Sequence, residues 1–174
     1  MQGWPAVRRV DDQPRTSDAD GQGWPTAMRS GDPRVLLVDD EPRLRAQLGA
    51  VLADYGVVIL GEAGTGREGV ELACRLHPDV VLMDLRMPEL DGIAATRQLS
   101  ELLPSIAVIM LSAYQDPALM SEAREAGAYT YLIKGCPVSQ LVEVIEQAAA
   151  GRAGPPPPTG ATPSGRMAAE HPHG

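Results

Sequence analysis

Residues 79–92 read Asp79-Val-Val-Leu-Met-Asp84-Leu-Arg-Met-Pro88-Glu-Leu-Asp91-Gly92, with four apolar residues between the first two carboxylates. An uninterrupted apolar run of this length predicts a strand over 79–84 with both faces buried, as in a parallel sheet covered by helices. Pro88 and Gly92 predict a loop directly after it. Open α/β sheets place their ligand sites at the carboxyl ends of strands. Asp84, which closes the strand, is therefore the first candidate functional residue.

On both sides of this segment, apolar runs of strand length alternate with segments of helical periodicity. Strand-like runs occupy 34–38, 57–60, 106–111 and 128–133, and helical patterns occupy 41–55, 66–76, 91–103, 116–126 and a last segment that Pro137 opens. Five strand-helix units of this kind predict an α/β fold, with a parallel sheet, helices on both faces and right-handed crossovers.

The chain has 174 residues, of which 44% are hydrophobic, enough for a single core with flanking tails. Residues 1–31 are rich in Gly, Pro, Asp, Ser and Arg without apolar periodicity, which predicts a disordered extension. The folded domain is expected over 32–152. Residues 153–174 contain four successive prolines at 155–158 and are expected to form a disordered tail.

The first segment also contains a repeat, since Gln2-Gly-Trp-Pro5 recurs as Gln22-Gly-Trp-Pro25. Both a chance repeat and a short docking motif are consistent with this pattern. Met28 is an alternative start, because the folded pattern begins a few residues after it.

The formal net charge is −8, and all of it belongs to residues 32–153. This charge argues against a broad nucleic-acid surface, which needs clustered Lys and Arg. No segment resembles a signal peptide or a membrane span, so a cytoplasmic location without membrane association is expected. Cys74 and Cys136 lack metal-ligand spacing and are expected to be free thiols.

Further polar residues follow the other predicted strands. Asp39 and Asp40 follow the first strand, Ser112 the fourth and Lys134 the fifth. Carboxylates brought together with Asp84 would repel each other, and a hard divalent ion such as Mg²⁺, which prefers oxygen ligands, resolves that conflict. Taken singly, each residue is better explained as a helix cap, a turn former or a surface charge. Their joint occurrence at successive strand ends favours one functional site.

These residues carry a resemblance to the receiver domain of two-component response regulators. The resemblance covers about residues 33–151 and implies a flavodoxin-like, doubly wound sheet of five parallel strands in the order 2-1-3-4-5. The matching pieces are Val35-Leu-Leu-Val-Asp39-Asp40-Glu41-Pro42, Asp79-Val-Val-Leu-Met-Asp84-Leu-Arg-Met-Pro88 with Asp91-Gly92, Leu111-Ser112-Ala113 and Tyr131-Leu-Ile-Lys134.

By this resemblance Asp84 is the phosphoacceptor, which takes a phosphoryl group from a sensor histidine kinase or a phosphotransfer protein. Lys134 would contact a phosphoryl oxygen, Ser112 would move to hydrogen-bond the phosphoryl group, and Tyr131 would turn inward as the switch aromatic. The chemistry is phosphoryl transfer, in which the protein positions groups and neutralises charge. Such a domain is a signalling module that catalyses only its own phosphorylation and dephosphorylation.

The resemblance also implies the metal ligands. Asp39, Asp40 and Asp84 would hold Mg²⁺ together with the backbone carbonyl of Arg86. Arg86 and Tyr114 occupy positions that tune the phosphoryl lifetime in the family.

Gly135-Cys136-Pro137 follows the lysine where many receivers have proline directly, a pattern similar to the nitrate-responsive (NarL-type) subfamily. Members of that subfamily usually continue into a helix-turn-helix domain, which the short tail here cannot build. We therefore expect a stand-alone receiver without direct DNA binding, read by an unidentified downstream protein, with homodimerisation left open. The alternatives are a phosphorylation-independent interaction module and a truncated NarL-type transcriptional regulator.

A competing motif is Gly64-Thr-Gly66-Arg-Glu-Gly69, which matches the G-x-G-x-x-G dinucleotide fingerprint after a strand. That interpretation leaves Asp39, Asp40, Ser112 and Lys134 unexplained. The glycines are instead expected to relax the loop and the start of the helix.

Overall fold

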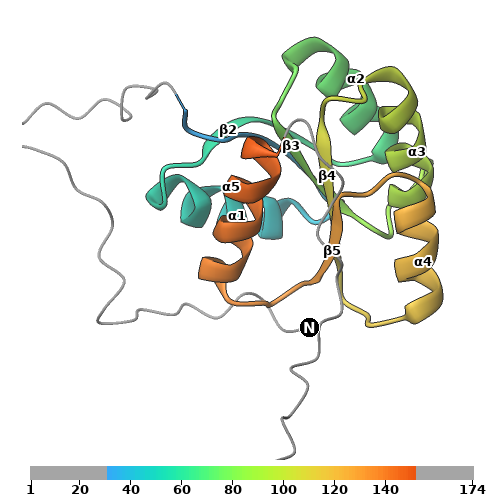
Figure 1. The fold of residues 1–174 in the computed structure, drawn as a ribbon. Coiled ribbons are helices and arrows are strands. Elements are labelled where there is room, and N and C mark those ends of the chain that lie inside the picture. The colour runs from blue at the N-terminus through green and yellow to red at the C-terminus, as the bar shows by residue number, and fades with distance from the viewer. Residues whose placement is uncertain (1–30, 152–174) are drawn as a thin grey trace, which may run out of the picture.

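The computed structural model describes residues 31–151. The predictions about the Gln-Gly-Trp-Pro repeat, Met28 and the proline-rich tail lie outside these residues. Figure 1 shows strands and helices alternating along the chain. The strands are β1 (Arg34–Val38), β2 (Val58–Ala63), β3 (Val80–Asp84), β4 (Ala107–Ser112) and β5 (Thr130–Ile133). The helices are α1 (Pro42–Asp54), α2 (Gly66–Leu76), α3 (Gly92–Leu102), α4 (Pro117–Glu125) and α5 (Val138–Ala150).

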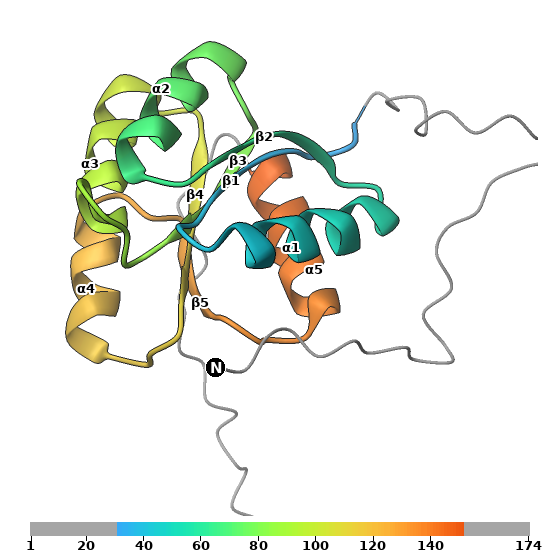
Figure 2. The same cartoon turned by 180° about the vertical axis from the view of Figure 1, so that it is seen from behind.

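The strands form a single five-stranded sheet in the order β2-β1-β3-β4-β5, and every neighbouring pair is parallel. This order confirms the predicted flavodoxin-like architecture. Helices α1 and α5 cover one face of the sheet, and α2, α3 and α4 cover the other (Figures 1 and 2). The order of the strands reverses between β1 and β3, and a crevice at such a switch point is where open sheets bind ligands.

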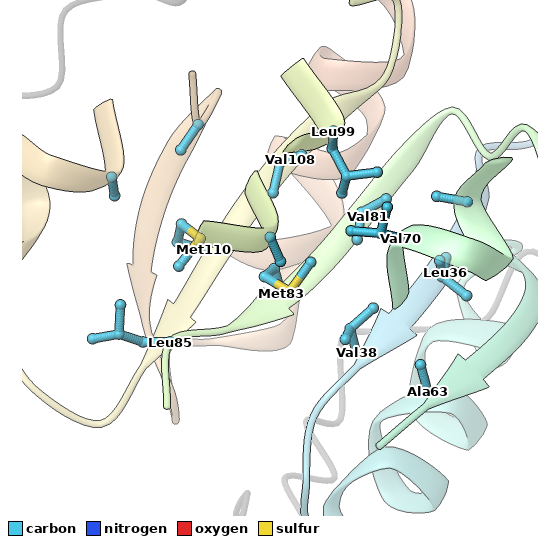
Figure 3. Packing of buried hydrophobic residues seen from close by; sticks show 14 residues of the cluster. Leu36, Val38, Ala63, Val70, Val81, Met83, Leu85, Leu99, Val108 and Met110 are labelled. Carbon is cyan, nitrogen blue, oxygen red and sulfur yellow. The ribbon is translucent and has the colours of Figure 1, made fainter. Parts of the chain in front are cut away.

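The burial of both faces explains the uninterrupted apolar strands. Along β1, Val35 and Leu37 pack towards α1 and α5, whereas Leu36 and Val38 pack towards α2 and α3. All four side chains are at most 1% exposed. Figure 3 shows the second of these clusters, in which Leu36 and Val38 lie with Val81, Met83 and Met110 beneath Val70 and Leu99. Burying each side chain of this size contributes roughly 2 kcal/mol, so the two apolar layers hold the sheet rigidly beneath its polar end.

Two strand boundaries differ from the prediction by more than one residue. β2 continues to Ala63, three residues beyond the predicted end at Leu60. Gly61 and Glu62 are poor strand formers, yet both pair with β1 after a register shift. β5 begins at Thr130, two residues after its predicted start. The difference lies within the usual uncertainty of strand ends.

The glycines of the competing motif lie in the loop and the first turn of the predicted helix. Gly64 precedes α2, Gly66 is its first residue and Gly69 lies one turn further on. A Cβ atom at Gly66 would lie 2.3 Å from the carbonyl oxygen of Leu90, and one at Gly69 would lie 2.8 Å from Cγ1 of Val38. The absence of a side chain therefore lets α2 pack closely against β1 and the β3–α3 loop, because a Cβ would collide with both.

None of the helices within residues 31–151 combines the length and the apolar content that a membrane crossing requires.

Candidate functional site

Parallel pairing brings the predicted site residues to one edge of the sheet. Val38 lies beside Met83, Asp84 beside Leu111 and Ser112 beside Ile133, so the carboxyl ends of β1, β3, β4 and β5 are neighbours. The residues at or directly after these ends are Asp39, Asp40, Asp84, Ser112 and Lys134. Asp39, Asp84 and Ser112 are buried, with 8%, 6% and 1% of their surfaces exposed, and Asp40 is exposed.

Lys134 lies between two of the carboxylates. Its Nζ is 2.7 Å from Oδ2 of Asp39 and 2.7 Å from Oδ1 of Asp84. The side chain is 20% exposed and is the only lysine among the 174 residues. Its backbone N–H donates to the carbonyl oxygen of Ser112 at 2.7 Å, which anchors the lysine to the end of β4. The sheet therefore fixes the backbone position from which the Lys134 side chain extends.

Burial and neighbouring charges act in opposite directions at this pair. Burial raises the pKa of Asp84, the hydrogen bond and charge of Lys134 lower it, and the charge of Asp39 raises it, so the pKa lies above its usual value. Burial lowers the pKa of Lys134, but hydrogen bonds and charges of Asp39 and Asp84 raise it further, so this pKa is also above its usual value. Lys134 is therefore a permanent cation at neutral pH.

The carboxylates form a cluster that fits a divalent cation. One oxygen from each of Asp39, Asp40 and Asp84 lies within 4.8 Å of the others. Three carboxylates and the ammonium of Lys134 give this group a formal charge of −2. Hard oxygen ligands with this charge suit Mg²⁺, which binds one or two protein carboxylates and completes its shell with water and phosphate oxygens. The exposed Asp40 places the cluster next to solvent.

Asp39 is held by contacts from several parts of the chain. Its N–H donates to the carbonyl of Ala63 at the end of β2 at 3.1 Å. Its Oδ1 accepts the N–H of Glu41 at 2.9 Å, and its backbone carbonyl accepts a hydrogen bond from Nη1 of Arg45. Sequence reasoning missed Arg45. The available signal was a basic residue in the first turns of the helix that follows an acidic pair.

On the other side of the site, Tyr114 connects the two predicted switch residues. Its N–H donates to Oγ of Ser112 at 3.1 Å, and its carbonyl accepts the hydroxyl of Tyr131 at 2.7 Å. The guanidinium of Arg86 lies 5.8 Å from the centroid of the Tyr114 ring, within cation–π range. Arg86 and Tyr114, each two positions after a residue of the site, therefore contact each other at this edge of the sheet. The position of the Arg86 carbonyl as a metal ligand stays a prediction.

The loop after Asp84 is fixed by close packing. A Cβ at Gly92 would lie 2.0 Å from the carbonyl oxygen of Asp84, so only glycine fits here. The N–H of Gly92 donates to the carbonyl of Leu85 at 3.0 Å. Asp91 caps α3, with its Oδ1 accepting the N–H of Ala94 at 2.8 Å. The Asp91-Gly92 pair therefore fastens the phosphoacceptor candidate's loop to the start of α3.

Both cysteines are free, as predicted. Cys136 is partly buried two residues after Lys134, and burial raises the pKa of its thiol. Burial therefore keeps this thiol in its protonated form, which is a poor nucleophile.

Comparison with known proteins gives the same picture as the geometry. Residues 35–146 match the response regulator receiver domain. The chain is 42% identical over 116 residues to the transcriptional regulatory protein PdtaR of Mycobacterium tuberculosis, which covers 66% of this chain and 56% of that protein. It is 38% identical over 114 residues to the chemotaxis protein CheY of Thermotoga maritima, which covers 66% of this chain and 95% of CheY.

Solved structures agree. The signal receiver domain of the response regulator NarL from Mycobacterium tuberculosis aligns with a TM-score of 0.65 at 33% identity, covering 69% of this chain and 98% of that one. A complex of CheX and CheY with BeF3 and magnesium from Borrelia burgdorferi aligns with a TM-score of 0.60 at 28% identity, covering 63% and 84%. The chain spans 56% of the length of PdtaR and also of LiaR from Bacillus subtilis.

Proposed function

The chain belongs to the response regulator receiver domain family and is a two-component response regulator, and from this premise we propose that it is switched by a phosphoryl group carried on Asp84. Receiver domains are signalling modules that interact with histidine kinases and phosphotransfer partners. One observation carries the proposal. Lys134 contacts both Asp39 and Asp84 at 2.7 Å, inside a cluster of three carboxylates at the carboxyl edge of the sheet.

Asp84 is the nucleophile in this proposal. One of its oxygens attacks the phosphorus of a phosphohistidine, the bond from phosphorus to nitrogen breaks, and the imidazole takes the electron pair. Asp39 and Asp40, with Asp84 and the carbonyl of Arg86, would hold Mg²⁺, which when bound neutralises negative charge on the phosphoryl oxygens. The CheY complex from Borrelia burgdorferi, which contains BeF3 and magnesium, supports this assignment.

Lys134 changes partners in the course of the reaction. Its ammonium now pairs with Asp39 and Asp84, and a phosphoryl oxygen on Asp84 offers it a further anion at the same edge. Ser112 is suited to a second contact. Its Oγ accepts the N–H of Tyr114, and this leaves the hydroxyl proton free to be donated to the phosphoryl group.

Movement of Ser112 would reach Tyr131 through Tyr114, because Tyr114 hydrogen-bonds to both side chains. Tyr131 also lines a small hollow between α4 and β5 with Met120, Ala123, Arg124, Ala128 and Thr130. A change in the tyrosine would therefore alter this surface, which a downstream protein would read. The charge of the phosphoryl group supplies the bias for this shift.

The test is incubation with acetyl phosphate and Mg²⁺, followed by intact-protein mass spectrometry. We expect the mass of one phosphoryl group to be added, and we expect Asp84→Asn to abolish the addition. Asp91→Asn is the matched control, because it removes a carboxylate from the same loop while asparagine still caps α3. No addition to the unmodified protein would favour the phosphorylation-independent module instead.

A further inference from the structure

Arg45 is a basic side chain of α1 that turns back under the acidic cluster. Its side chain is 16% exposed, although the helix borders solvent. Nε lies 3.2 Å from Oε2 of Glu62 near the end of β2, and Nη1 donates to the backbone carbonyl of Asp39. The space over Gly64 is open enough to admit the guanidinium, since a Cβ at Gly64 would lie 3.7 Å from Nη1. One side chain thus ties together β1, β2 and α1.

The carbonyl that Arg45 holds belongs to the peptide group between Asp39 and Asp40. A peptide group is planar, so the direction of its carbonyl sets the rotation of the backbone on both sides. Those rotations determine where the two carboxylates point. A contact to this single oxygen therefore acts on two of the three members of the cluster at once.

We propose that Arg45 is a positioning residue for the magnesium site, which orients the carboxylates of Asp39 and Asp40 through the peptide group that joins them. The inference rests on the proposed function, because it assumes that the cluster binds Mg²⁺. Groups that orient metal ligands typically change metal affinity by 10- to 100-fold when they are removed.

A purely electrostatic effect of Arg45 has the opposite sign. A cation beside the cluster repels Mg²⁺, so its removal would strengthen binding if orientation played no part. Arg43 provides the matched control. It is an exposed arginine in the same first turn of α1, and its removal changes the net charge by the same amount.

The experiment measures the equilibrium affinity for MgCl₂ by calorimetry, without any phosphoryl donor. A parallel titration follows the ¹³Cε resonance of Lys134, which appears as one signal because the chain has a single lysine. We expect Arg45→Met to weaken Mg²⁺ binding about tenfold, at the lower end of the range for such groups. We expect Arg43→Met to leave it unchanged or slightly tighter. Arg45→Lys keeps the charge but loses the fork of donors, and we expect about threefold weaker binding.

Glu62→Gln separates the contact of Arg45 with the Asp39 carbonyl from the ion pair of Arg45 with Glu62. It keeps an acceptor for Nε of Arg45 while removing the ion pair, so we expect Mg²⁺ binding within about twofold of the unmodified protein. Unchanged or tighter binding in Arg45→Met overturns the inference. Should that variant fail to fold, unchanged binding in Arg45→Lys does so. Absence of Mg²⁺ binding in the unmodified protein overturns the proposed function itself, which distinguishes the two failures.

Discussion

The β1–α1 and β4–α4 connections flank Asp84, and they are held in different ways. In the β1–α1 connection, Asp39 is bonded through its N–H, its carbonyl and both carboxylate oxygens. The partners come from β2, from Glu41 in the connection itself, from α1 and from the loop after β5. Its burial is nearly complete, with 8% of the residue exposed. Several elements would have to move before this connection could change.

The β4–α4 connection is far more exposed. Tyr114 is 60% exposed, and the structure shows it held by one hydrogen bond to Ser112, one from Tyr131 and the guanidinium of Arg86 over its ring. The residues from Ala113 to Asp116 are all exposed. Segments with few buried contacts open at low free energy.

The difference indicates a division of labour around Asp84. A metal site needs ligands that keep their geometry, whereas a switch needs a segment with two arrangements of similar free energy. The contacts of the buried Asp39 suit the β1–α1 connection to the first requirement, and we propose that the exposed β4–α4 connection meets the second.

The largest effect is expected from Gly69→Ala. The added methyl would lie 2.8 Å and 2.9 Å from the two Cγ atoms of Val38, directly before Asp39. We expect the free energy of unfolding to fall by about 3 kcal/mol, the upper range for overpacking. Urea denaturation measures this. In the matched variant Gly64→Ala, the nearest atom to the new Cβ is 3.7 Å away, and we expect little change. Equal stabilities of Gly69→Ala and Gly64→Ala would mean that close packing of α2 does not hold β1 in place.

Lys134→Met tests the ion pairs that Lys134 forms with Asp39 and Asp84. It leaves the carboxylates of Asp39 and Asp84 facing each other, and we expect a loss of about 2 kcal/mol at neutral pH, below the range for a fully buried pair. The pKa of Lys134 is raised above 10.5, so its contribution is complete below that pH and is lost as the pH rises through the folded-state pKa.

Chemical denaturation with and without MgCl₂ checks this prediction. Mg²⁺ bound to the cluster replaces the missing cation, so we expect it to restore much of the stability of the variant. A loss that Mg²⁺ leaves untouched would contradict the proposed arrangement of charges.

The sequence predicted the parts of the site that follow from strand ends. Asp39, Asp84 and Lys134 close apolar runs, and parallel strands bring such residues to one edge. Arg45 does not lie at a strand end, and its place in the first turns of the helix after the acidic pair is a weaker signal. Its partner is a backbone carbonyl, which has no signature of its own in the sequence, and Glu62 lies in a part of β2 that its composition did not predict.

The glycines of α2 show the same limit. Their spacing matches a nucleotide-binding motif, and only the packed structure shows that Gly66 faces the Leu90 carbonyl and Gly69 faces Val38. Close approach depends on the distance between elements, which periodicity does not encode. The contact between Arg86 and Tyr114 likewise joins two loops that are separate in the sequence.

Asp84→Asn tests the residue between the two connections. Burial raises the pKa of Asp84 above 3.8, Lys134 lowers it and Asp39 raises it, so the folded protein holds this proton more tightly than the unfolded chain. Ionisation of Asp84 therefore costs stability, fully above the folded-state pKa and not at all below 3.8. We expect Asp84→Asn to be more stable than the unmodified protein at neutral pH, by less than the loss for Lys134→Met.

Thermal unfolding from acid to neutral pH in the absence of Mg²⁺ measures this difference. The two proteins should converge at low pH, where Asp84 is protonated. A variant less stable than the unmodified protein at neutral pH would mean that the attraction of Lys134 outweighs burial.

The smallest effect on stability is expected from Tyr131→Phe. The variant loses the hydroxyl that donates to the Tyr114 carbonyl at 2.7 Å, a bond near solvent worth about 0.5 kcal/mol. The mobility of the segment is the sharper measure. We expect faster amide hydrogen exchange in residues 113–116 and unchanged exchange in 39–41, because only the β4–α4 connection depends on this bond. In the matched control Tyr129→Phe, the hydroxyl has no hydrogen-bond partner within residues 31–151, so neither segment should change. Faster exchange in both segments of Tyr131→Phe would show that the β1–α1 and β4–α4 connections open as one cooperative unit.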